Sequence, residues 1–471
     1  MLSAIEQQSS WRTLLTGANG LRSLVLSGGV ALHAINIYIV TTILPTVIQE
    51  IGGITFYAWN TTLFVVASIV GSAVSAKMIE RQGAAKAYLF ALLLFSVGAG
   101  LCSLAPSMPV LLMGRTVQGL GGGVLFALSY ALIRVAFKRE LWPKAMALVS
   151  GMWGLATLCG PAIGGIFAQA GEWRMAFWIL LPVAAVLALI VWLLFRDMPA
   201  TPGQKDKLPW LTILFLILSV LSISAGGLSD SWIWNGAGIV AGLMLGWIIV
   251  RLDSLRKVAR LLPDGAYQFT HGIGLLFATM ALLVFGLTTE IYVPYFLQVI
   301  HQMSPLMAGY LTAVMAAGWT LAALASASAG EQRSLQMIRT GPVVVMISLV
   351  VLAVTLPMTT GGKGILICYG FALMGVGFGI GLAWPHLLTR VFASASAGEE
   401  TLTSSSVTTV QLYATALAAA LAGVVTNAAG ITDISDPQAV QSAARVLFSV
   451  FAIAPAVAAI LAWRLARQAK G

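Results

Sequence analysis

The sequence predicts an all-α integral membrane protein with fourteen transmembrane helices. Hydrophobic residues make up 59% of the 471 residues and charged residues only 9%, whereas a soluble domain has roughly a quarter charged residues. So few charges cannot cover a water-exposed surface, so lipid is the expected solvent. Two further observations specify the fold: long apolar runs recur along the chain, and Lys and Arg gather in alternate loops.

Each predicted helix is an apolar run of about 20 residues, the length that crosses the hydrocarbon core. The first run is too long for the apolar part of a signal peptide, so it is interpreted as a transmembrane helix. In chain order, the fourteen runs are 24–48, 57–79, 86–105, 109–136, 144–169, 174–195, 209–228, 233–252, 270–299, 305–329, 340–358, 364–389, 404–428 and 443–465.

The distribution of positive charge predicts the orientation of the chain. If the N-terminus is cytoplasmic, nearly every Lys and Arg falls on the cytoplasmic side, and the exceptions are Arg174, Lys363 and Arg445. If the helix count before any loop were changed by one, that loop and those after it would change sides of the membrane, and this asymmetry would be lost. Both termini are therefore predicted to be cytoplasmic, and the net charge of +10 reflects this loop bias rather than a nucleic-acid partner.

The helices group into two halves with an insertion between them. Transporters commonly pair two such repeats around a site near the membrane midplane. Glycine runs in the fourth and twelfth helices indicate either an internal repeat or close helix packing. The predicted parts are a cytoplasmic N-terminus at 1–23, a six-helix bundle at 24–195, an inserted transmembrane hairpin with flanking loops at 196–269, a second six-helix bundle at 270–465 and a cytoplasmic C-terminus at 466–471.

The fifth helix contains the segment Gly160-Pro161-Ala162-Ile163-Gly164-Gly165. Proline removes a backbone hydrogen bond and bends a helix. Glycine lets a neighbouring helix approach closely. The segment therefore predicts a kinked, tightly packed helix that could seal one side of a central cavity; the alternative is an ordinary seam of small residues.

The fourth helix contains Arg115-Thr116-Val117-Gln118-Gly119-Leu120-Gly121. A buried arginine costs roughly 3 kcal/mol or more at the bilayer centre, so Arg115 should face a polar cavity or a partner. The alternative is that its long side chain extends to the outer interface.

A third segment, Ala76-Lys77-Met78-Ile79-Glu80-Arg81-Gln82-Gly83, lies in the loop between the second and third helices. An acid and a base here can pair with charges and helix ends across a cytoplasmic gate. An ordinary charged loop is the alternative.

On these segments the chain resembles the major facilitator superfamily, and more narrowly the fourteen-helix drug:proton antiporter (EmrB/QacA-like) family. The first two match the family patterns G-P-x-x-G-G and R-x-x-Q-G-x-G, and the loop is a degenerate match to G-x-x-x-D-R-x-G-R-R. The resemblance implies two six-helix bundles plus an inserted hairpin, and a role for Arg115 in proton movement. It assigns gating roles to Glu80, Arg81, Gly83, Gly160, Pro161, Gly164 and Gly165.

Glu290 is the acidic residue that lies well within a predicted helix, in the ninth. A carboxylate in hydrocarbon is expensive unless it is protonated or paired. Competition between a proton and a substrate for one carboxylate is a minimal antiport mechanism. Glu290 is therefore predicted to be the main protonation site, and a purely structural or interfacial role is the alternative.

Several polar and aromatic residues are candidates for lining a substrate cavity. His33 and Asn36 share one face of the first helix, and Asn36 falls where many family members have an acid. Aromatic faces suit flat apolar compounds and cations, although they are also common packing residues. The predicted set is His33, Asn36, Gln118, Trp153, Tyr292, Tyr295, Trp384 and Gln411.

These features predict a proton-coupled exporter of amphipathic small molecules that works by alternating access in the bacterial cytoplasmic membrane. A metabolite or nutrient permease working as a symporter stays open as the alternative, because fold alone does not set the substrate. An enzyme is not expected, since neither H-E-x-x-H nor G-x-S-x-G occurs. No cofactor, metal or nucleic-acid partner is predicted. The partners expected are substrate, protons and lipid. The family resemblance adds a periplasmic adaptor as a candidate partner, which no feature of this sequence identifies.

Overall fold

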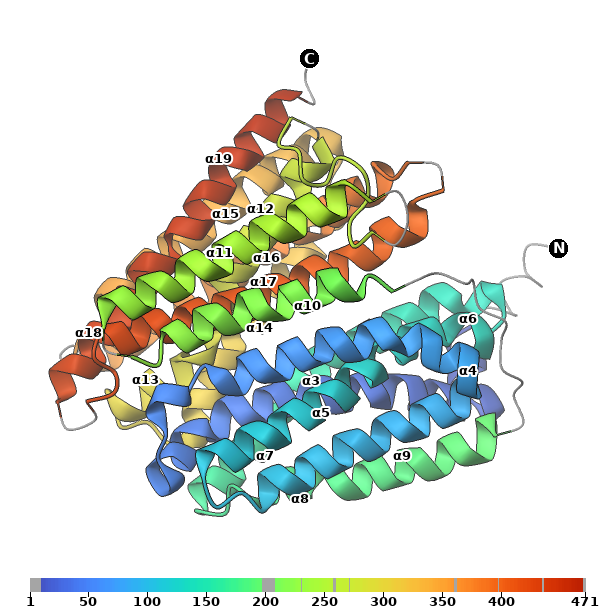
Figure 1. Cartoon of the computed structure of the whole chain (residues 1–471), viewed down its shortest axis with the longest axis horizontal. Coiled ribbons are helices and arrows are strands. Elements are labelled where there is room, and N and C mark those ends of the chain that lie inside the picture. The colour runs from blue at the N-terminus through green and yellow to red at the C-terminus, as the bar shows by residue number, and fades with distance from the viewer. Residues whose placement is uncertain are drawn as a thin grey trace. The chain divides into compact units, whose positions relative to one another are not determined.

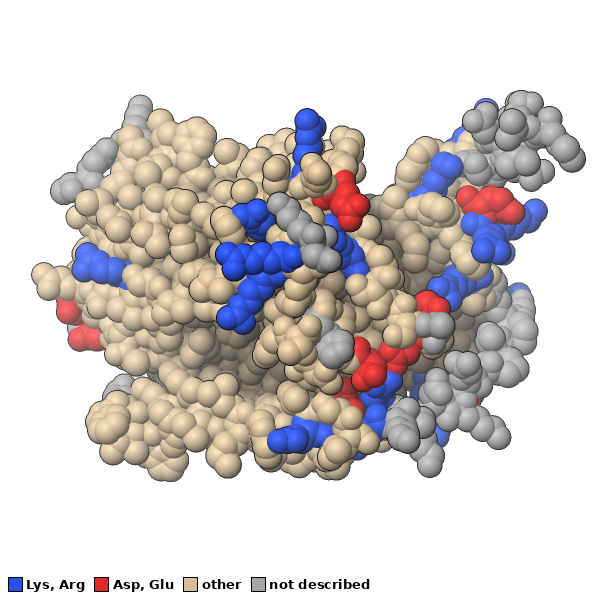
Figure 2. Space-filling model, turned by 90° about the horizontal axis from the view of Figure 1, so that it is seen from above, with Lys and Arg blue, Asp and Glu red and all other residues tan. Residues whose placement is uncertain are grey.

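The computed structural model describes residues 10–196, 208–229, 231–256, 260–270, 272–359, 362–396, 398–433 and 436–468. Throughout these ranges every regular element is an α-helix or a short 3-10 helix. Figure 2 shows one face of the molecule, where uncharged residues cover most of the surface and charged side chains form a few groups. The all-α prediction is confirmed.

The helices account for the predicted number of crossings. Among the described residues, twelve helical stretches are long and apolar enough to cross a membrane by length and composition, and α10 (Trp210–Gly226) is a shorter apolar helix. One of the twelve contains α4 (Trp59–Ser103), whose 45 residues are interrupted at Gly83. Because a crossing needs about 20 residues, α4 supplies two of them, and the structure agrees with fourteen.

The chain forms two compact units. Unit 1 comprises Met1–Gly52 and Leu63–Leu208, and unit 2 comprises Gly53–Thr62 and Pro209–Gly471. The helices of unit 1 are α2 (Trp11–Leu15), α3 (Gly17–Ile51), most of α4, α5 (Met108–Ala131), α6 (Ile133–Ala136), η2 (Arg139–Leu141), α7 (Trp142–Gln169), α8 (Met175–Trp178) and α9 (Leu180–Phe195).

Unit 2 contains the remaining helices, coloured green to red in Figure 1, and the short helix η1. They are η1 (Ile54–Phe56), α10, α11 (Trp232–Ser254), α12 (Gly272–Thr288), η3 (Thr289–Ile291), α13 (Val293–Val299), α14 (Pro305–Ser326), α15 (Glu331–Thr355), α16 (Gly362–Ala393), α17 (Glu400–Ala428), α18 (Pro437–Phe451) and α19 (Ile453–Gln468).

A single residue separates the two membrane-crossing limbs of α4. The sequence predicts a loop near 80–85, but the helix continues through Gln82 and breaks at Gly83. Gly83 has φ 81° and ψ 165°, a conformation that residues with a side chain rarely adopt. The expected loop is therefore one glycine hinge.

The glycines of α5 allow it to pack against both limbs of α4. A Cβ atom added at Gly119 would lie 2.8 Å from the Cα of Phe64 in the first limb. One added at Gly121 would lie 2.7 Å from the carbonyl oxygen of Ala91 in the second limb. Backbone contacts this close require glycine.

The glycine run of α16 has the same relation to two neighbours in unit 2. A Cβ atom at Gly377 would collide with the backbone of Met315 in α14, and one at Gly379 would collide with the side chain of Val345, 2.7 Å away in α15. The glycine runs thus serve close packing in both units, with one glycine-rich helix between two others. Their equivalence as repeats stays a prediction.

The two helices of the predicted hairpin, α10 and α11, lie side by side (Figure 1) and pack on each other. Both contact α17, and the hydroxyl groups of Ser219 in α10 and Tyr413 in α17 are 2.9 Å apart. The scheme of two halves plus an insertion stays a prediction, and most of the loop at 196–208 lies outside the described residues.

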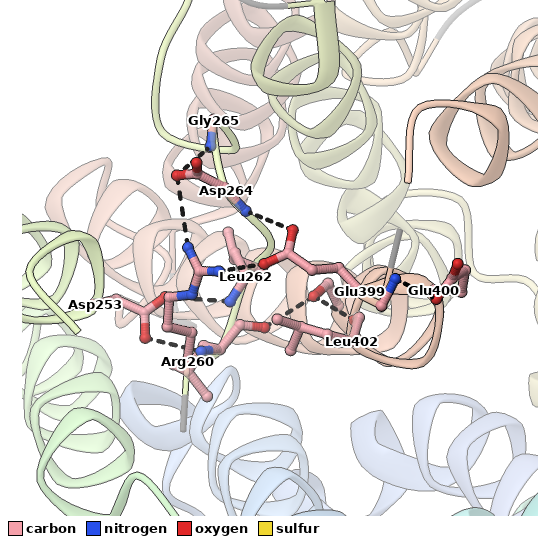
Figure 3. A network of polar contacts seen from close by, with 11 residues as sticks. Asp253, Arg260, Leu262, Asp264, Gly265, Glu399, Glu400 and Leu402 are labelled. Carbon is pink, nitrogen blue, oxygen red and sulfur yellow. Dashed lines mark hydrogen bonds and ion pairs between the residues drawn. The ribbon is translucent and has the colours of Figure 1, made fainter. Parts of the chain in front are cut away.

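The segment after α11 folds into a polar network (Figure 3). Asp253 is fully buried and accepts hydrogen bonds from the backbone N–H groups of Leu261 and Leu262, at 2.8 and 3.1 Å. The hydroxyl group of Tyr267 donates to Asp253 at 2.9 Å. Burial, reinforced by the adjacent carboxylate of Asp253, raises the pKa of Tyr267 above its usual range, so the phenol keeps the proton that it donates.

An ion-pair group continues this network to the start of α17. The Arg260 guanidinium pairs with the carboxylate of Glu399 and lies 3.5 Å from that of Asp264. The backbone N–H of Asp264 also donates to Glu399, at 3.2 Å. We name Asp253, Arg260, Asp264 and Glu399 the hairpin clasp, because they connect the end of α11 to the segment before α17.

Candidate functional site

The glycine-proline segment of α7 packs directly on α3. A Cβ atom at Gly160 would collide with the Cβ of Tyr38, and one at Gly164 would lie 2.9 Å from the carbonyl oxygen of Ile39. Pro161 lies inside the helix and is buried, as is Gly165. The tight packing predicted for this segment is therefore present, while its role in gating stays a prediction.

Arg115 is buried inside unit 1, with 2% of its surface exposed. Its Nη1 donates a 2.6 Å hydrogen bond to Oε1 of Gln118, one turn later in α5. Its guanidinium carbon also lies 4.1 Å from the centroid of the Phe64 ring in α4. The side chain thus has polar and aromatic partners within the bundle and does not extend to the surface.

His33 lies in an aromatic enclosure next to this arginine. Its ring centroid is 5.2 Å from that of Phe64, 5.4 Å from that of Phe126 and 6.3 Å from that of Trp153. Phe64 therefore contacts both His33 and Arg115. A Cβ atom at Gly122 would lie 2.8 Å from Nδ1 of His33, so glycine at this position of α5 makes room for the imidazole.

Several polar atoms around this enclosure have no hydrogen-bond partner among the described residues. They are Nδ1 of His33, both amide atoms of Asn36 and Nε2 of Gln118. Each unmade hydrogen bond of a buried polar group costs about 1–3 kcal/mol, and such groups in a native structure call for an explanation such as a role at a functional site. We name His33, Asn36, Arg115 and Gln118 the unit 1 polar cluster.

Glu290 lies where the ninth predicted helix is interrupted. The 3-10 helix η3 contains Glu290 and separates α12 from α13. The residue is half-buried, and none of the ion pairs found in the described parts of the chain includes it. Interrupted helices of this kind form the binding sites of many transporters.

Tyr292 and Tyr295 pack together beside this interruption. The Tyr57 ring stacks on that of Tyr292 with centroids 4.6 Å apart, and contacts Tyr295 edge-on at 5.3 Å. The Tyr57 hydroxyl donates to the carbonyl oxygen of Ile291 at 3.0 Å, and Thr426 donates to the Tyr292 hydroxyl at 2.9 Å. Within unit 2 these tyrosines are buried packing residues next to Glu290.

The structure also describes the remaining predicted residues. Trp384 is 8% exposed and its ring centroid is 5.6 Å from that of Trp319. Gln411 is half-buried in α17. Glu80 is half-buried and Arg81 exposed, and neither forms an ion pair within the part of the chain that the structure describes.

The structure assigns the predicted coupling residues to different units, Arg115 to unit 1 and Glu290 to unit 2. It also adds Phe64, Phe126 and Tyr57, which sequence reasoning missed. Each is one aromatic residue in or beside an apolar run, so no local pattern separates it from packing residues. In the described ranges, no group of three or more His, Cys, Asp or Glu residues is arranged to hold a metal ion.

The family model described as "Major Facilitator Superfamily" matches residues 26–419. The chain belongs to the major facilitator superfamily. A "Probable multidrug-efflux transporter" of Mycobacterium tuberculosis is 35% identical over 471 residues, which cover 98% of each chain. "Multidrug resistance protein 3" of Bacillus subtilis is 25% identical over 299 residues, covering 62% of this chain and 57% of that protein.

Solved structures of this superfamily's fold cover nearly the whole chain. A POT family transporter in complex with a thioalcohol-conjugated peptide has a TM-score of 0.66 at 14% identity, covering 94% of this chain and 96% of its own. A bacterial homolog of the human lysosomal transporter Spinster has a TM-score of 0.64 at 14% identity, covering 96% and 98%. The superfamily assignment makes this chain a multi-pass membrane transporter.

Proposed function

We propose that this superfamily member is a proton-coupled secondary transporter that exports amphipathic small molecules across a bacterial cytoplasmic membrane, with both termini cytoplasmic. The observation that supports the proposal most strongly is the 35% identity, over 98% of both chains, to a protein named as a probable multidrug-efflux transporter. A match of this extent includes the helices of both units and is not confined to one of them.

In this proposal Glu290 exchanges a proton for substrate. The interruption of the helix at η3 places the carboxyl group on irregular backbone, and no arginine or lysine neutralises it among the described residues. A carboxyl group in such surroundings is stabilised either by a proton or by a cationic substrate. Binding of one therefore opposes binding of the other, which couples the two movements.

The unit 1 polar cluster has a supporting role in the proposal. Asn36 cannot exchange a proton in the physiological range, so the cluster contributes hydrogen-bonding groups and the positive charge of Arg115 instead of a second carboxylate. The buried amide atoms of Asn36 and Gln118 have unused hydrogen-bonding capacity. They are the groups in unit 1 that would orient polar parts of a substrate.

Transport by everted membrane vesicles under an imposed pH gradient tests this function. With the lumen more acidic, a lipophilic fluorescent cation should accumulate in the lumen while protons leave it. Vesicles that contain a Glu290→Gln variant should lose this accumulation, and vesicles with Glu331→Gln, a change at an exposed residue, should keep it. Movement of protons and substrate in the same direction would contradict export and support a symporting permease.

A further inference from the structure

A groove lies near the C-terminal end of α19, in unit 2. It is an open, shallow groove of about 390 Å³, lined by Ala459, Ile460, Trp463, Arg464 and Arg467 of this one helix. Ile460 and Trp463 are 57% and 49% exposed, so the groove is an open surface with an apolar floor. The two arginines give one part of it a strongly positive edge.

A third arginine belongs to the same place. Arg339 of α15 lies with its guanidinium carbon 3.5 Å from the centroid of the Trp463 ring. Its Nε is buried and has no hydrogen-bond partner among the described residues. Stacking on the indole therefore fixes this side chain beside the groove, where its other nitrogen atoms add to the positive charge.

The three arginines form no ion pair with an acidic side chain in the described ranges. The ion pairs found there involve Arg174, Arg260 and Arg390 instead. Without acidic partners among the described residues, these side chains are free to pair with an anion from outside the chain. Arginine binds phosphate with paired hydrogen bonds, and tryptophan is enriched where membrane proteins meet lipid headgroups.

We propose that this groove binds an anionic phospholipid. The headgroup phosphate lies between Arg464 and Arg467, and an acyl chain covers Ile460 and Ala459. A soluble anion would leave the apolar floor exposed, and a neutral lipid would leave the arginines uncompensated. An anionic phospholipid covers the apolar residues of α19 and also pairs with its arginines, and clusters of basic residues near the ends of transmembrane helices are known to attract such lipids.

Native mass spectrometry and thermal unfolding of the purified protein in detergent test this proposal. Phosphatidylglycerol should raise the unfolding midpoint more than phosphatidylcholine with the same acyl chains, or inorganic phosphate. The double variant Arg464→Gln/Arg467→Gln should show an at least threefold smaller fraction of protein with bound phosphatidylglycerol. The matched control Arg445→Gln, at an exposed arginine of α18, should bind as the wild type does.

The charge-conserving double variant Arg464→Lys/Arg467→Lys separates lipid binding from a folding defect. It should retain a preference for phosphatidylglycerol over phosphatidylcholine, because the positive charge stays in place. Unchanged phosphatidylglycerol binding by the Gln double variant would overturn the proposal. Equal stabilisation of the wild type by phosphatidylcholine or by inorganic phosphate would overturn it as well.

Discussion

Phe64 and Arg115 form a cation–π contact inside unit 1, with the guanidinium carbon 4.1 Å from the ring centroid. Such a contact is worth about 2 kcal/mol or more when it is removed from water. Because Phe64 also contacts His33 at 5.2 Å between ring centroids, one phenyl ring positions two members of the unit 1 polar cluster. This ring should matter for transport although it has no polar group.

Replacing Phe64 tests that idea. Phe64→Leu removes the aromatic face but keeps an apolar side chain. The initial transport rate per amount of protein should fall roughly fivefold or more, which corresponds to losing at least about 1 kcal/mol of the contact. Phe64→Tyr keeps the ring and serves as the control. A Leu variant that transports at the wild-type rate would show that the ring does not position Arg115 for function.

Gly160 in α7 is predicted to be intolerant of a methyl group. The added Cβ of Gly160→Ala would collide with the Cβ of Tyr38 in α3, whereas Gly154 in the same helix has no atom within 4 Å of an added Cβ. Gly160→Ala should lower stability by about 1–3 kcal/mol, and should slow transport because α3 and α7 can no longer pack closely. Gly154→Ala should lower neither the stability nor the transport rate, because the added methyl group meets no atom and alanine favours the helix.

Thermal unfolding in detergent, together with transport in vesicles, measures both effects. Equal unfolding midpoints and equal transport rates for Gly160→Ala and Gly154→Ala would contradict the packing described for this segment.

The hairpin clasp should stabilise unit 2. Glu399→Gln removes a charge whose side chain is only 18% exposed and which contacts Arg260 and the backbone of Asp264. Hydrogen bonds to charged groups contribute about 1.5–3 kcal/mol, so the unfolding midpoint should fall measurably. Glu331→Gln is the control, since Glu331 is 83% exposed and lies 3.8 Å from Arg390, and exposed pairs contribute little. If both variants have the same unfolding midpoint as the wild type, the hairpin clasp does not stabilise unit 2.

His301, in the turn after α13, should make stability depend on pH. Burial lowers the pKa of His301 below its usual value near 6.5, although its hydrogen bond with the carbonyl oxygen of Leu356 acts in the opposite direction. The unfolded state then binds the proton more readily, so stability is retained above about pH 6.5 and lost as pH falls below it.

The comparison of wild type with His301→Gln between pH 7.5 and 5.5 isolates this contribution. The unfolding midpoint of the wild type should fall more on acidification than that of the variant. If the unfolding midpoints of the two proteins fall equally with pH, His301 does not contribute to the pH dependence of stability.

The sequence predicted the transmembrane helices well because apolar length and charged loops are local properties of the chain. It also predicted the tight packing at Gly160 and a partner for Arg115. It did not predict that the loop before Lys86 is a single glycine break, or that Phe64 contacts both Arg115 and His33. Such contacts join residues distant in sequence, and one phenylalanine among many apolar residues gives no local signal.

Proton release on substrate binding tests the central claim most directly. Purified protein in weakly buffered detergent solution near neutral pH should release protons when a lipophilic cation is added, because the cation displaces the proton from Glu290. Glu290→Gln should bind without proton release. Equal proton release by the variant and the wild type would contradict the account.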